Sequence, residues 1–293
     1  MMLGCSTADI KQRKRHEETQ VFLAFLCFFL FLTACSNNEK AARAQLTQAQ
    51  NLYEQTQYGS AKQVLDNLKS QYPQELTVRK EALLLMREIE TKEQERNLIY
   101  CDSLLPILHA EADSMKQYFS FIKNSEYDSE EKYVDKTQSS SISPGEKYIR
   151  ISVNELGEMA LTGVYSGTVS LKHNQLRITN SDGKYQETEA IPFDGGTNYS
   201  FKDDTGTIYE LVTYQKGRDN GVISFIYNSA NQKLTMEYIG EKKQLSVILS
   251  DKEKKALVQT VDLAVILQNL DRLKKEKEKA EKRIEYLRSK QAQ

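Results

Sequence analysis

The stretch Lys147–Val153, KYIRISV, marks the point at which the sequence changes its period. Ile149, Ile151 and Val153 alternate with more polar side chains, a pattern typical of a strand with one buried face. Before this stretch apolar residues recur at helical spacing, and after it the two-residue alternation returns until about residue 250. The change predicts an α+β protein in which helices and strands are segregated along the chain.

Residues 146–250 are predicted to form an antiparallel β-domain. Short segments rich in Asp, Asn and Gly separate the alternating runs, and such connections can join only antiparallel neighbours. About eight strands in a meander favour a small β-sandwich or an open barrel. Besides Lys147–Val153, the runs are Met159–Leu161, Val169–Leu171, Leu176–Ile178, Tyr209–Leu211, Val222–Ile226, Leu234–Tyr238 and Leu245–Leu249.

Residues 251–293 are predicted to form a C-terminal coiled-coil helix, with Asp251 after Ser250 as its cap. Apolar residues recur at alternating three- and four-residue spacing from Leu263 to Leu287, interrupted by Lys277. This heptad seam must be buried against another surface. Two partners are open: the chain's own helix between Glu75 and Ile99, in an antiparallel arm, or a second copy in a parallel homodimer.

Residues 35–123 are predicted to be helical, beginning with a hairpin. One helix runs from about Ala41 to Gln55, and a second follows the turn at Tyr58 and ends before Pro73. Ala49, Tyr58, Ala61 and Pro73 have spacings that resemble a tetratricopeptide repeat. A plain helical hairpin is the alternative, because Gln45 and Gln48 stand where the repeat has large apolar residues.

Two further helices are expected before the β-domain. The first starts just after Pro73 and is expected to be broken or kinked around Cys101–Ser103, since Pro106 lacks a backbone donor. The second runs to about Phe121. Residues 124–145 are polar, acidic and then serine-rich, which predicts a linker.

The N-terminus has the pattern of a signal peptide over residues 1–34. Basic residues between Lys11 and Arg15 precede an apolar run, Val21–Leu32, that is short for a membrane span. The run ends in Leu32-Thr33-Ala34-Cys35, which resembles the lipobox of bacterial lipoproteins. An uncleaved transmembrane helix, or a secretory signal with an incidental cysteine, is the alternative.

The resemblance to lipoproteins implies cleavage between Ala34 and Cys35 and lipidation of Cys35, with acyl chains such as palmitate as the membrane anchor. It also implies a polar tether starting at Ser36-Asn37-Asn38. By analogy with the family, Ser36 in place of Asp favours the outer membrane. The mixed charges of Glu39 and Lys40 favour its periplasmic side. The whole chain resembles Bacteroides-type lipoproteins with a short helical repeat region, a β-domain and a coiled coil.

Composition bounds the partners and the sources of stability. The 40 Lys and Arg residues nearly balance the 41 Asp and Glu residues, so no overall field favours nucleic acid. Cleavage and lipidation would leave Cys101 as the one unmodified cysteine, which precludes an internal disulfide. We expect Cys101 to be a buried helix residue; a reactive or dimer-forming thiol is the alternative.

The sequence contains few candidate sites for chemistry. It has no phosphate loop, dinucleotide fingerprint, HExxH motif or nucleophile elbow with the required spacing. His109 is expected on a helix, as a structural or surface residue, and His173 in a turn. The Asp-Gly loops could bind calcium, but they are equally ordinary turns. We therefore expect no enzyme, metal or cofactor.

Tyrosine is the one residue type that suggests a ligand surface. Strands favour tyrosine in any case, so the alternative is an ordinary sheet. The residues concerned are Tyr148, Tyr165, Tyr199, Tyr209, Tyr214, Tyr227 and Tyr238. The sequence favours a membrane-anchored periplasmic scaffold that binds an envelope protein, with a glycan- or peptidoglycan-binding module as the second hypothesis and a hydrolase as the third.

Overall fold

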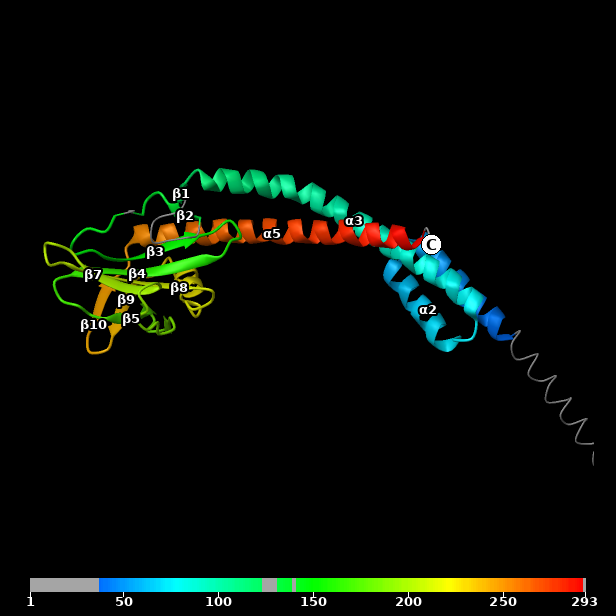
Figure 1. Cartoon of the computed structure of the whole chain (residues 1–293), viewed down its shortest axis with the longest axis horizontal. Helices are drawn as coiled ribbons and strands as arrows, with labels where there is room; N and C mark the ends of the chain where they lie inside the picture. Colours follow the sequence, from blue (N-terminus) through cyan, green and yellow to red (C-terminus); the bar gives the residue numbers. More distant parts are fainter. Residues whose placement is uncertain (1–36, 123–130, 139–140, 292–293) are drawn as a thin grey trace, which may run out of the picture. The chain divides into compact units, whose positions relative to one another are not determined.

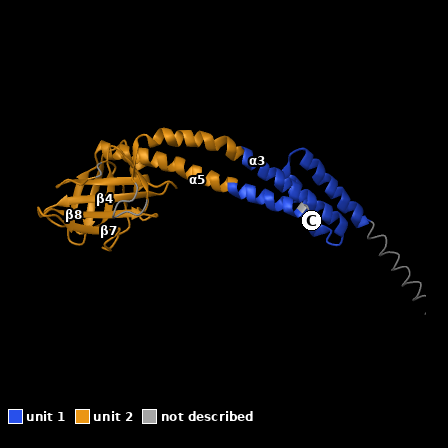
Figure 2. Ribbon diagram, turned by 45° about the horizontal axis from the view of Figure 1, so that its top comes forward, with its two compact units in different colours: residues 1–99, 278–293 blue, residues 100–277 orange. Residues whose placement is uncertain are grey.

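The computed structural model describes residues 37–122, 131–138 and 141–291. The chain divides into two compact units, one made of residues up to Ile99 together with those from Glu278, the other of Tyr100–Lys277 (Figure 2). Helices and two antiparallel sheets are segregated along the sequence, so the predicted α+β class with a long C-terminal helix is confirmed. Within the described residues, no helix is long and apolar enough to cross a bilayer.

The first unit is a helical bundle. A helix over residues 37–54 is followed by α2 (Tyr58–Gln71) and by the first half of α3 (Leu76–Lys116). Figure 2 shows these helices side by side. Small residues, Ala49 and Ala61, are fully buried where the first two helices meet, and large ones fill the remaining core. That core consists of Ala42, Leu46, Ala49, Ala61, Leu65, Leu68, Val78, Ala82, Leu85 and Ile89.

The last part of α5 (Asp251–Gln291) also belongs to this unit. Arg288 contacts Glu95 at 3.3 Å, and Arg283 pairs with Glu90. The guanidinium of Arg87 donates to the carbonyl of Lys290 at 2.8 Å. From the Arg87–Lys290 contact to the Glu90–Arg283 contact the residue numbers rise on α3 and fall on α5. The two helices therefore run antiparallel, and this half of the seam is buried within one chain.

The second unit contains both sheets. The strands of the first are β1 (Phe119–Ile122), β2 (Lys132–Asp135), β3 (Lys147–Val153), β4 (Met159–Gly167), β8 (Ile208–Gln215) and β7 (Asn198–Lys202), in that order across the sheet. The second sheet has the order β10 (Gln244–Ile248), β9 (Leu234–Gly240), β5 (His173–Asn180) and β6 (Tyr185–Glu187). Every pairing is antiparallel (Figure 1).

One apolar core joins the two sheets. Ile149 and Ile151 of β3 lie in it, with Leu161 of β4, as the alternation predicted. From the second sheet Tyr238 enters the core, and its hydroxyl donates to the carbonyl of Val164 at 2.7 Å. The alternating residues therefore decide which face of each sheet is inside.

The first part of α5 packs in this unit. Leu263, Leu267 and Leu270 share a core with Ala112 of α3 and Val153 of β3. Ser250, rather than Asp251, caps the helix in a capping box: the Glu253 N–H donates to the Ser250 hydroxyl at 3.3 Å, and the Ser250 N–H donates to the Glu253 carboxylate at 2.8 Å. The other carboxylate oxygen of Glu253 accepts the Ile149 N–H at 3.1 Å. The cap thus also attaches α5 to β3.

Four of the expected elements are wrong. The segment from Val222 is the helix α4 (Val222–Asn228), because its buried residues also fit helical spacing. Val169–Leu171 is a loop. The expected break at Cys101–Ser103 is absent, since α3 continues through Pro106, whose exposed side faces away from the buried Ala112. His173 was expected in a turn, but it is the first residue of β5 and is 1% exposed.

Other strands had not been expected. β1 begins at Phe119, where the sequence predicted continued helix, and β2 lies within the predicted linker. Both are only four residues long, too short for a period-two pattern to stand out. β6 and β7 are also short and carry mixed polar residues.

Candidate functional site

The residues of the predicted anchor, Ala34 and Cys35, lie outside the described part of the chain. The first described residues, 37–54, form a helix. Asn37 and Asn38, expected in a polar tether, are therefore in a helix. Ser36 alone separates this helix from Cys35 in the sequence.

The seven tyrosines do not share a surface. Tyr165, Tyr214 and Tyr238 are buried in the core of the second unit. Tyr227, on α4, is exposed and its hydroxyl donates to Asp262 at 2.9 Å. The tyrosines are therefore used mainly as core residues of the sheets.

A smaller aromatic cluster lies at the β7 edge of the first sheet. The ring of Phe201 stacks on that of Tyr209 with centroids 4.7 Å apart and on that of Tyr199 at 6.5 Å. Phe201 is 49% exposed, whereas Tyr209 beneath it is 6% exposed. This stack is what remains of the predicted aromatic surface, and Phe201 was not among the residues predicted for it.

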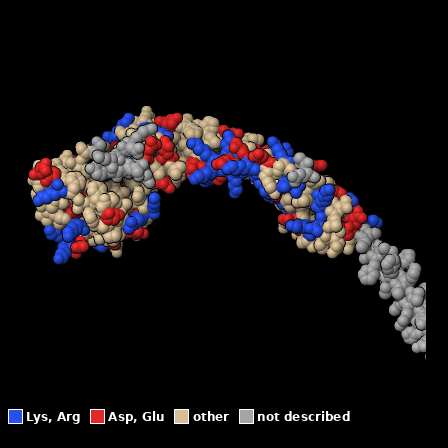
Figure 3. Space-filling view, in the orientation of Figure 1, with Lys and Arg blue, Asp and Glu red and all other residues tan. Residues whose placement is uncertain are grey.

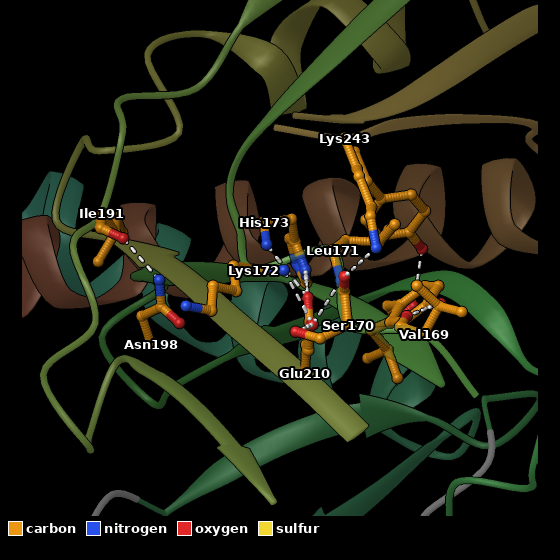
Figure 4. Close-up of polar contacts among 12 residues, drawn as sticks. Val169, Ser170, Leu171, Lys172, His173, Ile191, Asn198, Glu210 and Lys243 are labelled. Carbon is orange, nitrogen blue, oxygen red and sulfur yellow. Dashed lines mark hydrogen bonds and ion pairs between the residues drawn. The ribbon is translucent and has the colours of Figure 1, made fainter. Parts of the chain in front are cut away.

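The densest buried polar cluster surrounds Glu210 of β8, whose side chain is 3% exposed. One carboxylate oxygen accepts the Ser170 hydroxyl at 2.7 Å and the N–H groups of Leu171 and Lys172 at 2.8 and 2.9 Å. The other accepts the His173 N–H at 3.1 Å and lies 2.9 Å from His173 Nδ1. Figure 4 shows the segment from Ser170 to His173 wrapped around this carboxylate.

The backbone of this segment explains its shape. Lys172 has φ +51°, in the left-handed region, which turns consecutive N–H groups toward one point. Such a turn of successive donors forms a nest for an anion. Gly240 of β9 lies against it, since a Cβ there would be 2.1 Å from the Leu171 carbonyl oxygen. The loop is therefore held between β8 and β9.

The cluster keeps Glu210 ionised. Burial by itself would raise the pKa of this carboxyl group, but the hydrogen bonds from His173, Ser170 and Lys172 outweigh it and lower the pKa to about 2. At neutral pH the carboxylate is charged and accepts every hydrogen bond described above.

Serine, histidine and a carboxylate are also the residues of a hydrolase triad, but their geometry here differs. In a triad the serine hydroxyl bonds the histidine, and the carboxylate orients the histidine from its other side. Here Ser170 and His173 both bond Glu210. His173 Nε2 is buried without a hydrogen-bond partner among the described residues, and the ring meets Tyr238 edge-on at 5.0 Å. This geometry holds the loop from Ser170 to His173 in place, and it does not place His173 to accept a proton from the Ser170 hydroxyl.

The aspartates of the Asp-Gly loops accept hydrogen bonds from residues of the same loop. Asp194 accepts the N–H groups of Gly196 and Asn198 at 2.9 and 2.8 Å and the Thr197 hydroxyl at 2.6 Å. The Thr197 hydrogen bond, followed by those two, lowers the pKa of Asp194 to about 2. Asp203 accepts equivalent bonds from Thr205 and Thr207. These are Asx turns, and the described residues contain no group of three metal-ligating side chains.

Cys101 and His109 lie on α3. Cys101 is 1% exposed, and burial raises the pKa of its thiol, which makes it a poor nucleophile. His109 is exposed. These placements agree with the first expectation for each residue.

Comparison with known proteins adds no identification: no family model, curated protein or solved structure matches the chain.

Proposed function

We propose that this chain is a non-catalytic interaction protein of the bacterial envelope, attached by acyl chains on Cys35 to the outer membrane and facing the periplasm. The lipobox-like stretch Leu32–Cys35 supports the anchor. The cluster at Glu210 supports the non-catalytic role, because Ser170 and His173 are both occupied in holding a loop.

The observation that carries the interaction role is an uncharged face of α3 in the second unit. Six exposed residues recur at helical spacing on the side opposite the buried Cys101 and Ala112. Tyr100 and Ile107 are 57% and 62% exposed. The face consists of Tyr100, Ser103, Pro106, Ile107, Ala110 and Ser114.

Such a face is unusual for this chain, of which 28% is charged. Basic and acidic side chains intermix along α5 in Figure 3, as expected for a solvated helix. A continuous uncharged stripe on an exposed helix is instead characteristic of a protein-binding surface. We propose that it binds an uncharged segment of an envelope protein.

Site-specific photocrosslinking in living cells tests this. A photoreactive residue at Ile107 should yield one reproducible crosslinked protein. The matched control is the same residue at His109, which is exposed on the other side of α3 and should give no such product. Equal products from both positions, or none from Ile107, would refute the proposed surface.

A second candidate function is glycan binding at the β7 edge, favoured by the stack of Phe201 on Tyr209. An exposed ring backed by another ring offers a rigid apolar surface to the face of a sugar. Pull-down on purified peptidoglycan should then be weakened by Phe201→Ala and unaffected by Phe193→Ala, since Phe193 is exposed outside the stack. Unchanged binding by Phe201→Ala would remove this candidate.

A further inference from the structure

The first unit carries a second apolar surface, on the first turns of α3. Leu76, Leu83 and Leu84 are 72%, 50% and 44% exposed. Side chains advance about 100° per residue around a helix, so Leu76 and Leu83 lie opposite the buried Val78 and Leu85. This leucine face, with Lys80 between its members, points away from the hairpin core.

The leucine face lies near the start of the described chain. Arg43 contacts Glu81 at 3.6 Å, and the Tyr53 hydroxyl donates to Glu88 at 2.8 Å. The helix over residues 37–54 therefore runs parallel to α3, and its beginning lies level with Leu76. The first described residues of the chain and the leucine face therefore lie at the same end of this unit.

The spacing of Cys35 makes contact with the bilayer unavoidable once the residue is acylated. Two residues reach at most about 7 Å even when fully extended, so residue 37, the first described residue of this helix, must then lie near the headgroups. A longer polar tether would have allowed the unit to stand away from the membrane. The chain does not provide one.

We infer that the leucine face rests on the lipid surface beside the anchor. This inference depends on the proposed acylation of Cys35. Leu76, Leu83 and Leu84 would enter the boundary between headgroups and acyl chains, as in interfacial helices, whose apolar faces are buried about 5–10 Å deep. Lys80 would extend its ammonium group into the headgroups while its methylene chain lies among the leucines.

The leucine face extends over about two turns of α3. Leu76 and Leu84 are eight residues apart, which is about 12 Å along the helix axis. The acylated Cys35 then supplies lasting attachment, and the leucines fix how the first unit lies on the membrane. One lipid-anchored point alone would leave that orientation free.

Depth-dependent fluorescence quenching tests the inference on the full-length, processed protein in phosphatidylethanolamine/phosphatidylglycerol vesicles. Leu83→Cys and, as control, Thr77→Cys are labelled with an environment-sensitive dye. The unsubstituted chain reports any labelling of Cys101, which is buried. Thr77 is exposed and closer to the anchor than Leu83, but it projects about 100° away from Leu76.

The leucine face predicts a blue-shifted emission at position 83 that spin-labelled lipids quench more strongly than emission at position 77. If the label at position 83 stays in water while the protein is bound to vesicles, the proposed contact of the leucine face with lipid is refuted and the proposed anchor is not. A blue shift at position 83 without quenching by lipids indicates that the leucine face contacts protein, which also refutes the proposed contact with lipid. Protein that neither carries acyl mass nor floats with vesicles overturns both the anchor and the inference.

Discussion

Replacing Glu210 by Gln removes the charge at the centre of the buried cluster while keeping the shape of the side chain. The amide retains one acceptor oxygen, and its NH₂ group then faces N–H donors of Leu171, Lys172 or His173. Buried donors that lose their acceptor each cost about 1–3 kcal/mol. The loop that starts β5 should therefore become the weakest part of the second unit.

The size of the effect follows from the pKa of Glu210. On folding, that pKa falls from the ordinary 4.5 to about 2, which corresponds to about 3 kcal/mol of stability. Because the folded-state pKa is the lower one, the contribution is complete above pH 4.5 and is lost as the pH falls toward 2. We expect Glu210→Gln to lower the free energy of unfolding by about 3 kcal/mol at pH 7.

Guanidinium unfolding followed by circular dichroism measures this at pH 7 and at steps down to pH 2.5. The parent chain should lose stability between pH 4.5 and 2.5, and Glu210→Gln should show less of that loss. Glu241→Gln, at an exposed position, is the matched control. Parent-like stability of Glu210→Gln at pH 7, or an unchanged acid dependence, would refute the reasoning.

Three further predictions concern the helices that pack on the sheets. Gly157→Ala should cost about 3 kcal/mol in chemical denaturation, because its Cβ would lie 2.5 Å from the Ala264 carbonyl oxygen at φ +79°. Gly183→Ala, with the similar φ of +78° but open space, should cost about 1 kcal/mol. Ser250→Ala should lower the thermal midpoint by removing about 1 kcal/mol of capping, and an unchanged midpoint would contradict the capping box. Light scattering in detergent should find a monomer, since α5 buries its seam on α3. Leu270→Asp should then destabilise that monomer, and a dimer dissolved by this substitution would contradict the pairing within the chain.

Local sequence patterns correctly predict a helix or strand where the element is long and only one of its faces is buried. The alternation at Lys147–Val153 predicts β3 because Ile149 and Ile151 enter the core between the sheets and Val153 enters the core shared with α5. The heptad seam predicts α5 for the same reason. Short runs are ambiguous, as Val222–Asn228 shows: Val222, Ile223 and Ile226 are buried, and that spacing suits a helical turn as well as a strand.

Pro106 shows tertiary packing overriding a local rule. A proline inside a helix removes one hydrogen bond and costs about 3 kcal/mol, which led to the expected break in α3. Leu105, Leu108 and Ala112, on the side opposite the proline ring, pack with residues of α5. Fully burying a leucine contributes about 1.5–3 kcal/mol. Leu105 and Leu108 are partly buried and Ala112 is fully buried, so their packing offsets the cost of the proline.

The cluster at Glu210 could not be predicted because its members are distant in sequence and ordinary in composition. Ser170 and His173 precede Glu210 by about forty residues, and the left-handed turn at Lys172 that gathers the N–H groups is formed by a residue type without preference for it. Only the pairing of β8 with β4, and of β5 with β9, places the carboxylate inside the turn. A glutamate flanked by apolar and aromatic strand residues, in the run Ile208–Val212, was the one available signal. An ionised side chain on the inner face of a sheet needs several hydrogen-bond donors. The sequence thus indicates that Glu210 must accept hydrogen bonds, but not which residues donate them.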